Sequence, residues 1–162
     1  MPNHDLPPTL MPSVLDRLID PNSGGTSSRR GYTADQMMTA VKRDLEELLN
    51  TRQSHTGLSP DFVEVHRSLI GYGLPDLTSL NAISPEQRDD IGHVLEQVVS
   101  TFEPRLRDVH AFVVESGGGA GFERTVRFRL EARLNVDPAP EVAFDTILEL
   151  TTGHYSIQST AT

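Results

Sequence analysis

The sequence predicts an α+β protein, in which N-terminal helices pack on a C-terminal antiparallel sheet of three to four strands. Two observations lead to this fold class. Apolar residues recur at helical spacing up to residue 103, and they alternate with polar residues from about residue 108 onward. The length of 162 residues allows one domain with its own core, but not two of ordinary size. We therefore expect a single domain over residues 14–157, flanked by flexible segments at 1–13 and 158–162.

Helical patterns come first along the chain. Residues 13–20 place four apolar side chains on one face of a short helix, which the following proline ends. Residues 35–52 are predicted to form a longer helix, whose polar face would pair Arg43 with Glu47 at i,i+4 spacing. The apolar stripe of this helix consists of Met37, Met38, Val41, Leu45, Leu48 and Leu49.

A third helix is predicted over residues 84–103. Ser84 is its N-cap, Pro85 takes the first helical position, and Pro104 follows its end. Before this helix, residues 61–70 form a short apolar segment that leads into a turn with two glycines.

Strands are expected in the second half, over residues 108–115, 123–136, 142–150 and 154–158. In the second of these, apolar residues alternate strictly with polar ones. The apolar face consists of Val126, Phe128, Leu130, Ala132 and Leu134, and the polar face includes Arg127, Arg129, Glu131 and Arg133. One face of the sheet should therefore be buried and the other charged.

The glycine-rich segment 117–121 invites comparison with a phosphate-binding loop. Such a loop follows a strand and opens a helix, so that helix amides meet the phosphate. Here the segment lies between two predicted strands, and no Gly-Lys-Ser/Thr follows it. A flexible hairpin loop is the better interpretation.

Composition excludes several classes of function. The net charge of −9 argues against nucleic acid as the main ligand, since phosphate binding needs a basic surface. There is no cysteine, and the six histidines show no metal-ligand spacing, so no cofactor or metal is expected. No apolar run is long enough to span a bilayer, and the N-terminal residues lack the pattern of a secretory signal. We expect a cytoplasmic protein without direct membrane insertion.

The segment Glu103-Pro104-Arg105 is the most distinctive candidate site. As a hydrolase acid, Glu103 would need a second carboxylate at a fixed distance, and the sequence marks none. Arg105 also favours the ionised form of Glu103, which does not suit a general acid. Alternatively, the proline holds two opposite charges at a defined corner, where the guanidinium can bridge to another chain. A surface helix end with an incidental ion pair is the third possibility.

Four stretches together resemble the TssE family of type VI secretion baseplate proteins. They are VKRDLEELLNTR (41–52), SLIGYGLPDL (68–77), FEPRL (102–106) and VAFDTILELTTGHYSI (142–157), and the likeness runs in order from about residue 14 to residue 157. That family is related to the wedge protein of contractile phage tails often called lysozyme-like. Its members often have Asn-Tyr-Gly where this chain has Gly71-Tyr72-Gly73, and this extra glycine is expected to loosen the turn.

The resemblance implies a structural, non-enzymatic subunit of a baseplate docked to the inner-membrane complex. Its partners would be the wedge subunits TssF and TssG and the subunits of the contractile sheath, whose polymerisation it would seed by strand addition. Glu103, Pro104 and Arg105 would form a protein interface, and Arg127, Arg129 and Arg133 would face an acidic neighbour or simply solvent. The open alternatives are a peptidoglycan hydrolase with Glu103 as general acid and a generic adaptor.

Overall fold

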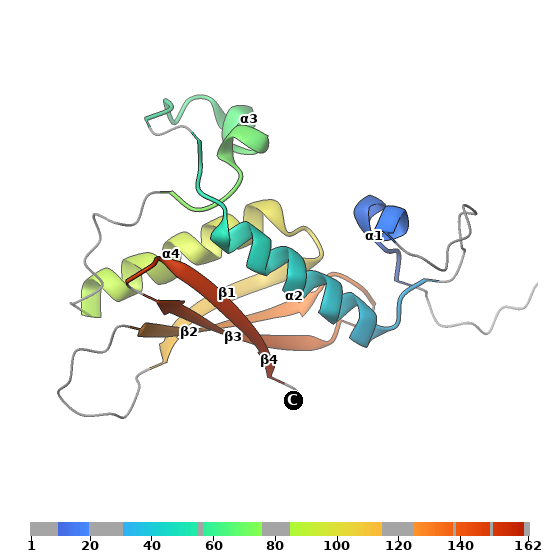
Figure 1. Ribbon diagram of the computed structural model, residues 1–162. Helices are drawn as coiled ribbons and strands as arrows, with labels where there is room; N and C mark the ends of the chain where they lie inside the picture. Colours follow the sequence, from blue (N-terminus) through green and yellow to red (C-terminus); the bar gives the residue numbers. More distant parts are fainter. Residues whose placement is uncertain are drawn as a thin grey trace, which may run out of the picture.

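The computed structural model describes residues 10–19, 31–54, 57–75, 85–114, 125–137, 139–149 and 151–160. Within this part of the chain the helices come first and the strands last (Figure 1). The elements are α1 (Val14–Ile19), α2 (Ala34–Asn50), α3 (Val63–His66), the 3-10 turn η1 (Leu69–Gly71), α4 (Pro85–Phe102), β1 (Leu106–Val114), β2 (Thr125–Leu134), β3 (Glu141–Glu149) and β4 (His154–Thr160). The predicted α+β class is confirmed.

The four strands form one antiparallel sheet in the order β1-β2-β3-β4, so β1 and β4 are its edges. Helices α2 and α4 lie on the same side of this sheet (Figure 1). The β1–β2 register shifts by one residue between Arg107 and His110, where Asp108 has a φ of 52°. This bulge bends the start of the first edge strand.

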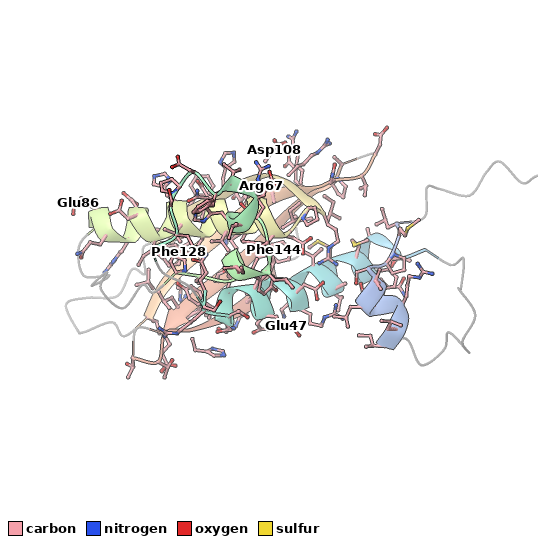
Figure 2. All side chains as sticks on the ribbon, turned by 90° about the horizontal axis from the view of Figure 1, so that it is seen from above. Glu47, Arg67, Glu86, Asp108, Phe128 and Phe144 are labelled. Carbon is pink, nitrogen blue, oxygen red and sulfur yellow. The ribbon has the colours of Figure 1, made fainter. Side chains whose placement is uncertain are left out.

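The core lies between the helices and one face of the sheet. Phe128 of β2 and Phe144 of β3 are completely buried and lie beneath the helices in the middle of the molecule (Figure 2). Opposite them, α2 and α4 present apolar stripes at the predicted spacing. These stripes consist of Met37, Val41, Leu45, Leu48 and Leu49 on α2 and of Ile91, Leu95, Val98 and Val99 on α4. Each such side chain contributes about 1.5–3 kcal/mol by leaving water.

Helix boundaries follow local signals in the sequence. Thr33 accepts a hydrogen bond from the backbone of Gln36, whose side chain accepts one from the Thr33 backbone in return. At the other end of the helical half, α4 ends at Phe102, two residues before Pro104. The predicted cap Ser84 and the glycine segment 117–121 lie outside the described residues.

Both edges of the sheet are bonded by a side chain from the helix above them. On β4, the Asn50 amide donates to the Tyr155 carbonyl over 2.8 Å and accepts from its N–H over 2.9 Å. On β1, Glu96 Oε1 accepts from the Ala111 N–H over 2.8 Å. Each contact occupies backbone groups that an edge strand would otherwise leave free for another chain.

Helix α1 is inverted relative to an ordinary surface helix. Its four apolar side chains face water, whereas Asp16 on the opposite side is only 2% exposed. Charge rather than apolar packing therefore holds this helix to the domain.

The predicted segment boundaries stay predictions. Residues 1–9 and 161–162 lie outside the described residues, while Leu10 forms an antiparallel bridge with Tyr32. Strand β4 continues to Thr160, so residues 158–160 belong to the sheet.

Candidate functional site

The Glu103-Pro104-Arg105 segment forms the corner at which the helical half meets the sheet. Glu103 still donates its backbone N–H to Val99 of α4 over 2.9 Å, and its carbonyl accepts from the N–H of Leu106, the first residue of β1. Glu103 as a whole residue is only 4% exposed, whereas Pro104 is exposed. The proline thus turns the chain and directs the flanking charges inward.

Both carboxylate oxygens of Glu103 are bound by Arg105. Oε1 accepts from Arg105 Nε over 2.6 Å and from the Arg105 backbone N–H over 3.1 Å. Oε2 accepts from Arg105 Nη2. This is the bidentate guanidinium–carboxylate geometry, which fixes both groups against each other.

Arg105 also connects the corner to α2. Its Nη2 donates to Asp44 Oδ2 over 2.6 Å, and the other oxygen of Asp44 accepts from Arg43 Nε over 2.8 Å. Arg43 Nη2 then donates to Asp16 Oδ1 of α1 over 2.8 Å. We call these five residues, Glu103, Arg105, Asp44, Arg43 and Asp16, the charged network. It connects the start of the sheet to α2 and α1.

Burial and pairing set the ionisation of this network. Burial alone would lower the pKa of Arg105, but the hydrogen bonds and charge of Glu103, and then of Asp44, raise it on balance. For Asp16, burial would raise the pKa, but hydrogen bonds from Ser13 and Arg43 lower it below the ordinary value. Both groups are therefore held in their charged forms.

This arrangement does not suit general acid catalysis. A general acid needs a carboxyl group that carries a proton and reaches substrate, whereas Glu103 is buried and bound at both oxygens. The carboxylate of Asp44 is bridged to it by the same guanidinium, rather than facing it across a substrate cleft. Arg105 Nη1 is buried and makes no hydrogen bond within the described part of the chain.

The three predicted arginines of β2 lie on the uncovered face of the sheet, away from the charged network. Arg129 donates from Nε to Asp145 of β3 over 2.9 Å, and Arg133 donates to Glu141 over 2.8 Å. Arg127 is exposed, and within the described residues it has no ion pair. The structure thus separates the six predicted interface residues into a corner, in which only Glu103 is fully buried, and a row on the uncovered face of the sheet.

The sequence reasoning missed the α2 and α1 members of the network. Arg43 pairs with Asp44 and Asp16, not with Glu47 as its spacing predicted. A signal for Asp44 was present, because this acid lies three residues after Val41 and four before Leu48, beside the apolar stripe. Asp16 gives no such signal, since its helix turns its apolar side outward.

Two further findings concern possible sites elsewhere. In the described ranges, no group of three or more histidine, aspartate or glutamate side chains could hold a metal ion. Among the same residues, no helix has both the length and the apolar character needed to cross a membrane.

Comparison with known proteins supplies the family. No curated protein matches the chain. Among solved structures, a chain of "The baseplate complex from the type VI secretion system" is similar at 19% identity and a TM-score of 0.46, covering 79% of this chain and 97% of that one. The sequence model of the family described as baseplate wedge protein gp25 matches residues 35–139, which is more than half of the chain. The match spans α2, α4, β1, β2 and the charged corner, and the chain belongs to the baseplate wedge protein gp25 family.

Proposed function

We propose that this chain is a non-enzymatic subunit of a type VI secretion baseplate, which joins the wedge subunits TssF and TssG and seeds the contractile sheath. It would act in the cytoplasm, in a baseplate docked to the inner-membrane complex. Membership of the gp25 wedge family and the resemblance to TssE support this proposal. The observation that carries it is the burial and complete pairing of Glu103, which suits a structural corner and not a hydrolase.

The corner would contact a wedge subunit through its exposed part. Glu103 and Arg105 pair with each other inside this chain, so they act chiefly by holding the corner rigid. Pro104 is exposed at its tip, and the side chain of Arg105 keeps 21% of its surface in contact with solvent. A rigid, pre-formed corner loses little conformational entropy on binding, which favours association.

The sheet would contact the sheath through strand addition at β4. Strand β1 is the weaker candidate because its start is bulged at Asp108. On β4, Tyr155 directs its backbone groups to Asn50 rather than to β3. Alternation along the strand therefore directs the backbone groups of Ile157 outward as well, toward an incoming strand.

Co-purification with the wedge subunits of the same organism tests the corner. We would compare wild type with Arg105→Ala, with Pro104→Glu and with the control Arg107→Ala. Pro104→Glu adds a charge at the exposed tip but leaves the ion pairs in place, so it separates loss of contact from loss of folding.

We expect wild type and Arg107→Ala to join the complex, and Pro104→Glu to be lost from it while keeping its circular dichroism spectrum. Equal recovery of all folded variants would show that the corner makes no wedge contact. Failure of wild type itself to join would overturn the baseplate proposal.

A further inference from the structure

A second exposed surface lies where the chain leaves the domain after α2 and returns before α4 (Figure 1). This excursion contains α3 and η1, and it exposes four large apolar side chains. They are Phe62 (56% exposed), Val63 (50%), Leu69 (89%) and Ile70 (41%), which we call the apolar knob. A leucine exposed to this degree, in one segment with three other exposed apolar side chains, is unusual for a surface that stays in water.

The base of the excursion is closed by backbone pairing. Gln53 donates its N–H to the Leu74 carbonyl over 2.9 Å, and Leu74 donates to Thr51 over 2.8 Å. Leu74 itself is buried in the core. The Gln53 side-chain amide donates to the carbonyls of Gly71 and Gly73, over 2.9 Å and 3.0 Å. The excursion that carries the knob is therefore held to the domain by hydrogen bonds at both of its ends.

The two glycines are required by close packing. A Cβ at Gly71 would lie 2.1 Å from the His66 carbonyl oxygen, and one at Gly73 would lie 2.4 Å from that of Thr51. Gly73 also has a φ of 102°, which other residues avoid. The expectation that the extra glycine loosens this turn is therefore wrong, because Gly71 allows the backbone to pack more closely there.

The shape of the knob is further fixed at η1 and beside the corner. Ser68 Oγ donates to the Val65 carbonyl over 2.7 Å and accepts from the Ile70 N–H. Tyr72 packs edge-on against Phe102 at the end of α4, with ring centroids 5.4 Å apart. A surface this constrained is pre-organised for binding, since little entropy remains to be lost.

Acidic side chains predominate around the knob. Asp61 and Glu64 flank its first two apolar residues, and one cation, Arg67, lies 4.0 Å from Glu64. At its base, burial and the negative charges of Glu47, Asp44 and Glu103 raise the pKa of the Tyr72 hydroxyl. The three described charges beside the apolar tip, Asp61, Glu64 and Arg67, thus sum to −1.

We propose that the apolar knob inserts into an apolar cleft, rimmed by basic side chains, on a neighbouring wedge subunit. The inference rests on the proposed baseplate function and adds to it a contact separate from the charged corner. Leu69 would be the anchor of this contact, because it is the most exposed of the four apolar side chains and gains most from burial.

Charge disfavours two other occupants. In a symmetric pair of these chains, each acidic rim would face the same rim on the other copy, and the net charge of −9 adds to that repulsion. An anionic lipid surface would likewise repel the acids beside the knob. A basic-rimmed protein cleft matches both the apolar tip and its surroundings.

Binding of purified full-length protein to a purified complex of the wedge subunits tests the proposal. We would measure the Kd of wild type, Leu69→Asp, Leu69→Met and Glu64→Lys, alongside Pro104→Glu. We expect Leu69→Asp to weaken binding by about 10- to 100-fold, Leu69→Met to bind like wild type, and Glu64→Lys to weaken binding several-fold. Because Leu69 and Glu64 are both exposed, the thermal unfolding of these three variants should match wild type.

The outcomes distinguish the knob from the corner. If Leu69→Asp binds like wild type while Pro104→Glu does not, the knob proposal is overturned and the wedge proposal stands. If wild type does not bind the complex, both fail. The knob proposal is also overturned if wild type, but not Leu69→Asp, binds zwitterionic or anionic vesicles, or forms dimers in light scattering.

Discussion

Arg105 at the corner and Arg129 on β2 both pair with a carboxylate close to them, yet their surroundings differ sharply. The Glu103 side chain is only 5% exposed and that of Arg105 21%, whereas Arg129 and Asp145 are 42% and 37% exposed. The corner pair also extends into a network across three elements, while the β2 pair joins two adjacent strands.

This difference in burial determines how much each arginine contributes to the stability of the fold. When one partner of an exposed pair is removed, water solvates the charge that remains, so the free energy of unfolding changes little. Inside the corner, removal of Arg105 would leave Glu103 buried without a counter-charge. Residues that look equivalent as interface candidates therefore differ in their effect on stability: the buried charges of the corner support the fold, whereas the exposed pairs on the sheet contribute little to it.

The largest effect should come from Arg105→Ala. We expect the free energy of unfolding to fall by about 3–5 kcal/mol, because an uncompensated carboxylate remains in the interior. Urea denaturation with Arg107→Ala as the matched control checks this, since Arg107 is exposed two residues further along. A loss below about 1 kcal/mol for Arg105→Ala would place the corner with ordinary surface pairs.

The second-largest effect should come from acidification, which weakens the attachment of α1 to the domain. The folded-state pKa of Asp16 is lowered, so its contribution is fully present above its unfolded pKa of about 3.9 and is lost as pH falls through the folded value. Below pH 4, local protection from amide hydrogen exchange should fall at residues 14–19 relative to the protection at Phe128 in the core. Asp16→Asn should lose about 1–3 kcal/mol of local protection already at pH 7. Unchanged exchange at α1 in that variant would refute the role of this carboxylate.

The smallest effect should come from the β2 row. We expect Arg129→Ala to lower the urea midpoint only slightly, and a double-mutant cycle with Asp145→Ala to give a small coupling, because water screens this pair. Arg127→Ala should leave stability within about 0.5 kcal/mol, because no ion pair is lost within the described residues. A coupling above about 2 kcal/mol would mean that the row, like the corner, is a structural element.

The fold could be predicted from the sequence where the pattern was long and local. The alternation from Val126 to Leu134 fixed which face of β2 is buried, and Pro104 placed the end of α4. The start of β1 was placed two residues late, at Asp108 rather than Leu106, because the bulge there interrupts the alternation.

The candidate site could be predicted only in part. Glu103 and Arg105 are close in sequence, and their pairing was expected from that spacing. The contacts to Asp44 and Asp16 span long separations, which one sequence does not reveal. Nor did the pattern of α1 show its orientation, because an apolar face predicts burial without saying whether this chain or another provides the cover.

The bond between Asn50 and Tyr155 limits how long a strand can be added to β4. Because the amide already bonds both backbone groups of Tyr155, an incoming strand has to pair beyond it, along the few residues that end at Thr160. Such a short ladder is weak by itself, so an added strand would exchange rapidly unless a second contact held the two chains together. Asn50 therefore sets the register of any strand that pairs with β4, and it makes that pairing readily reversible.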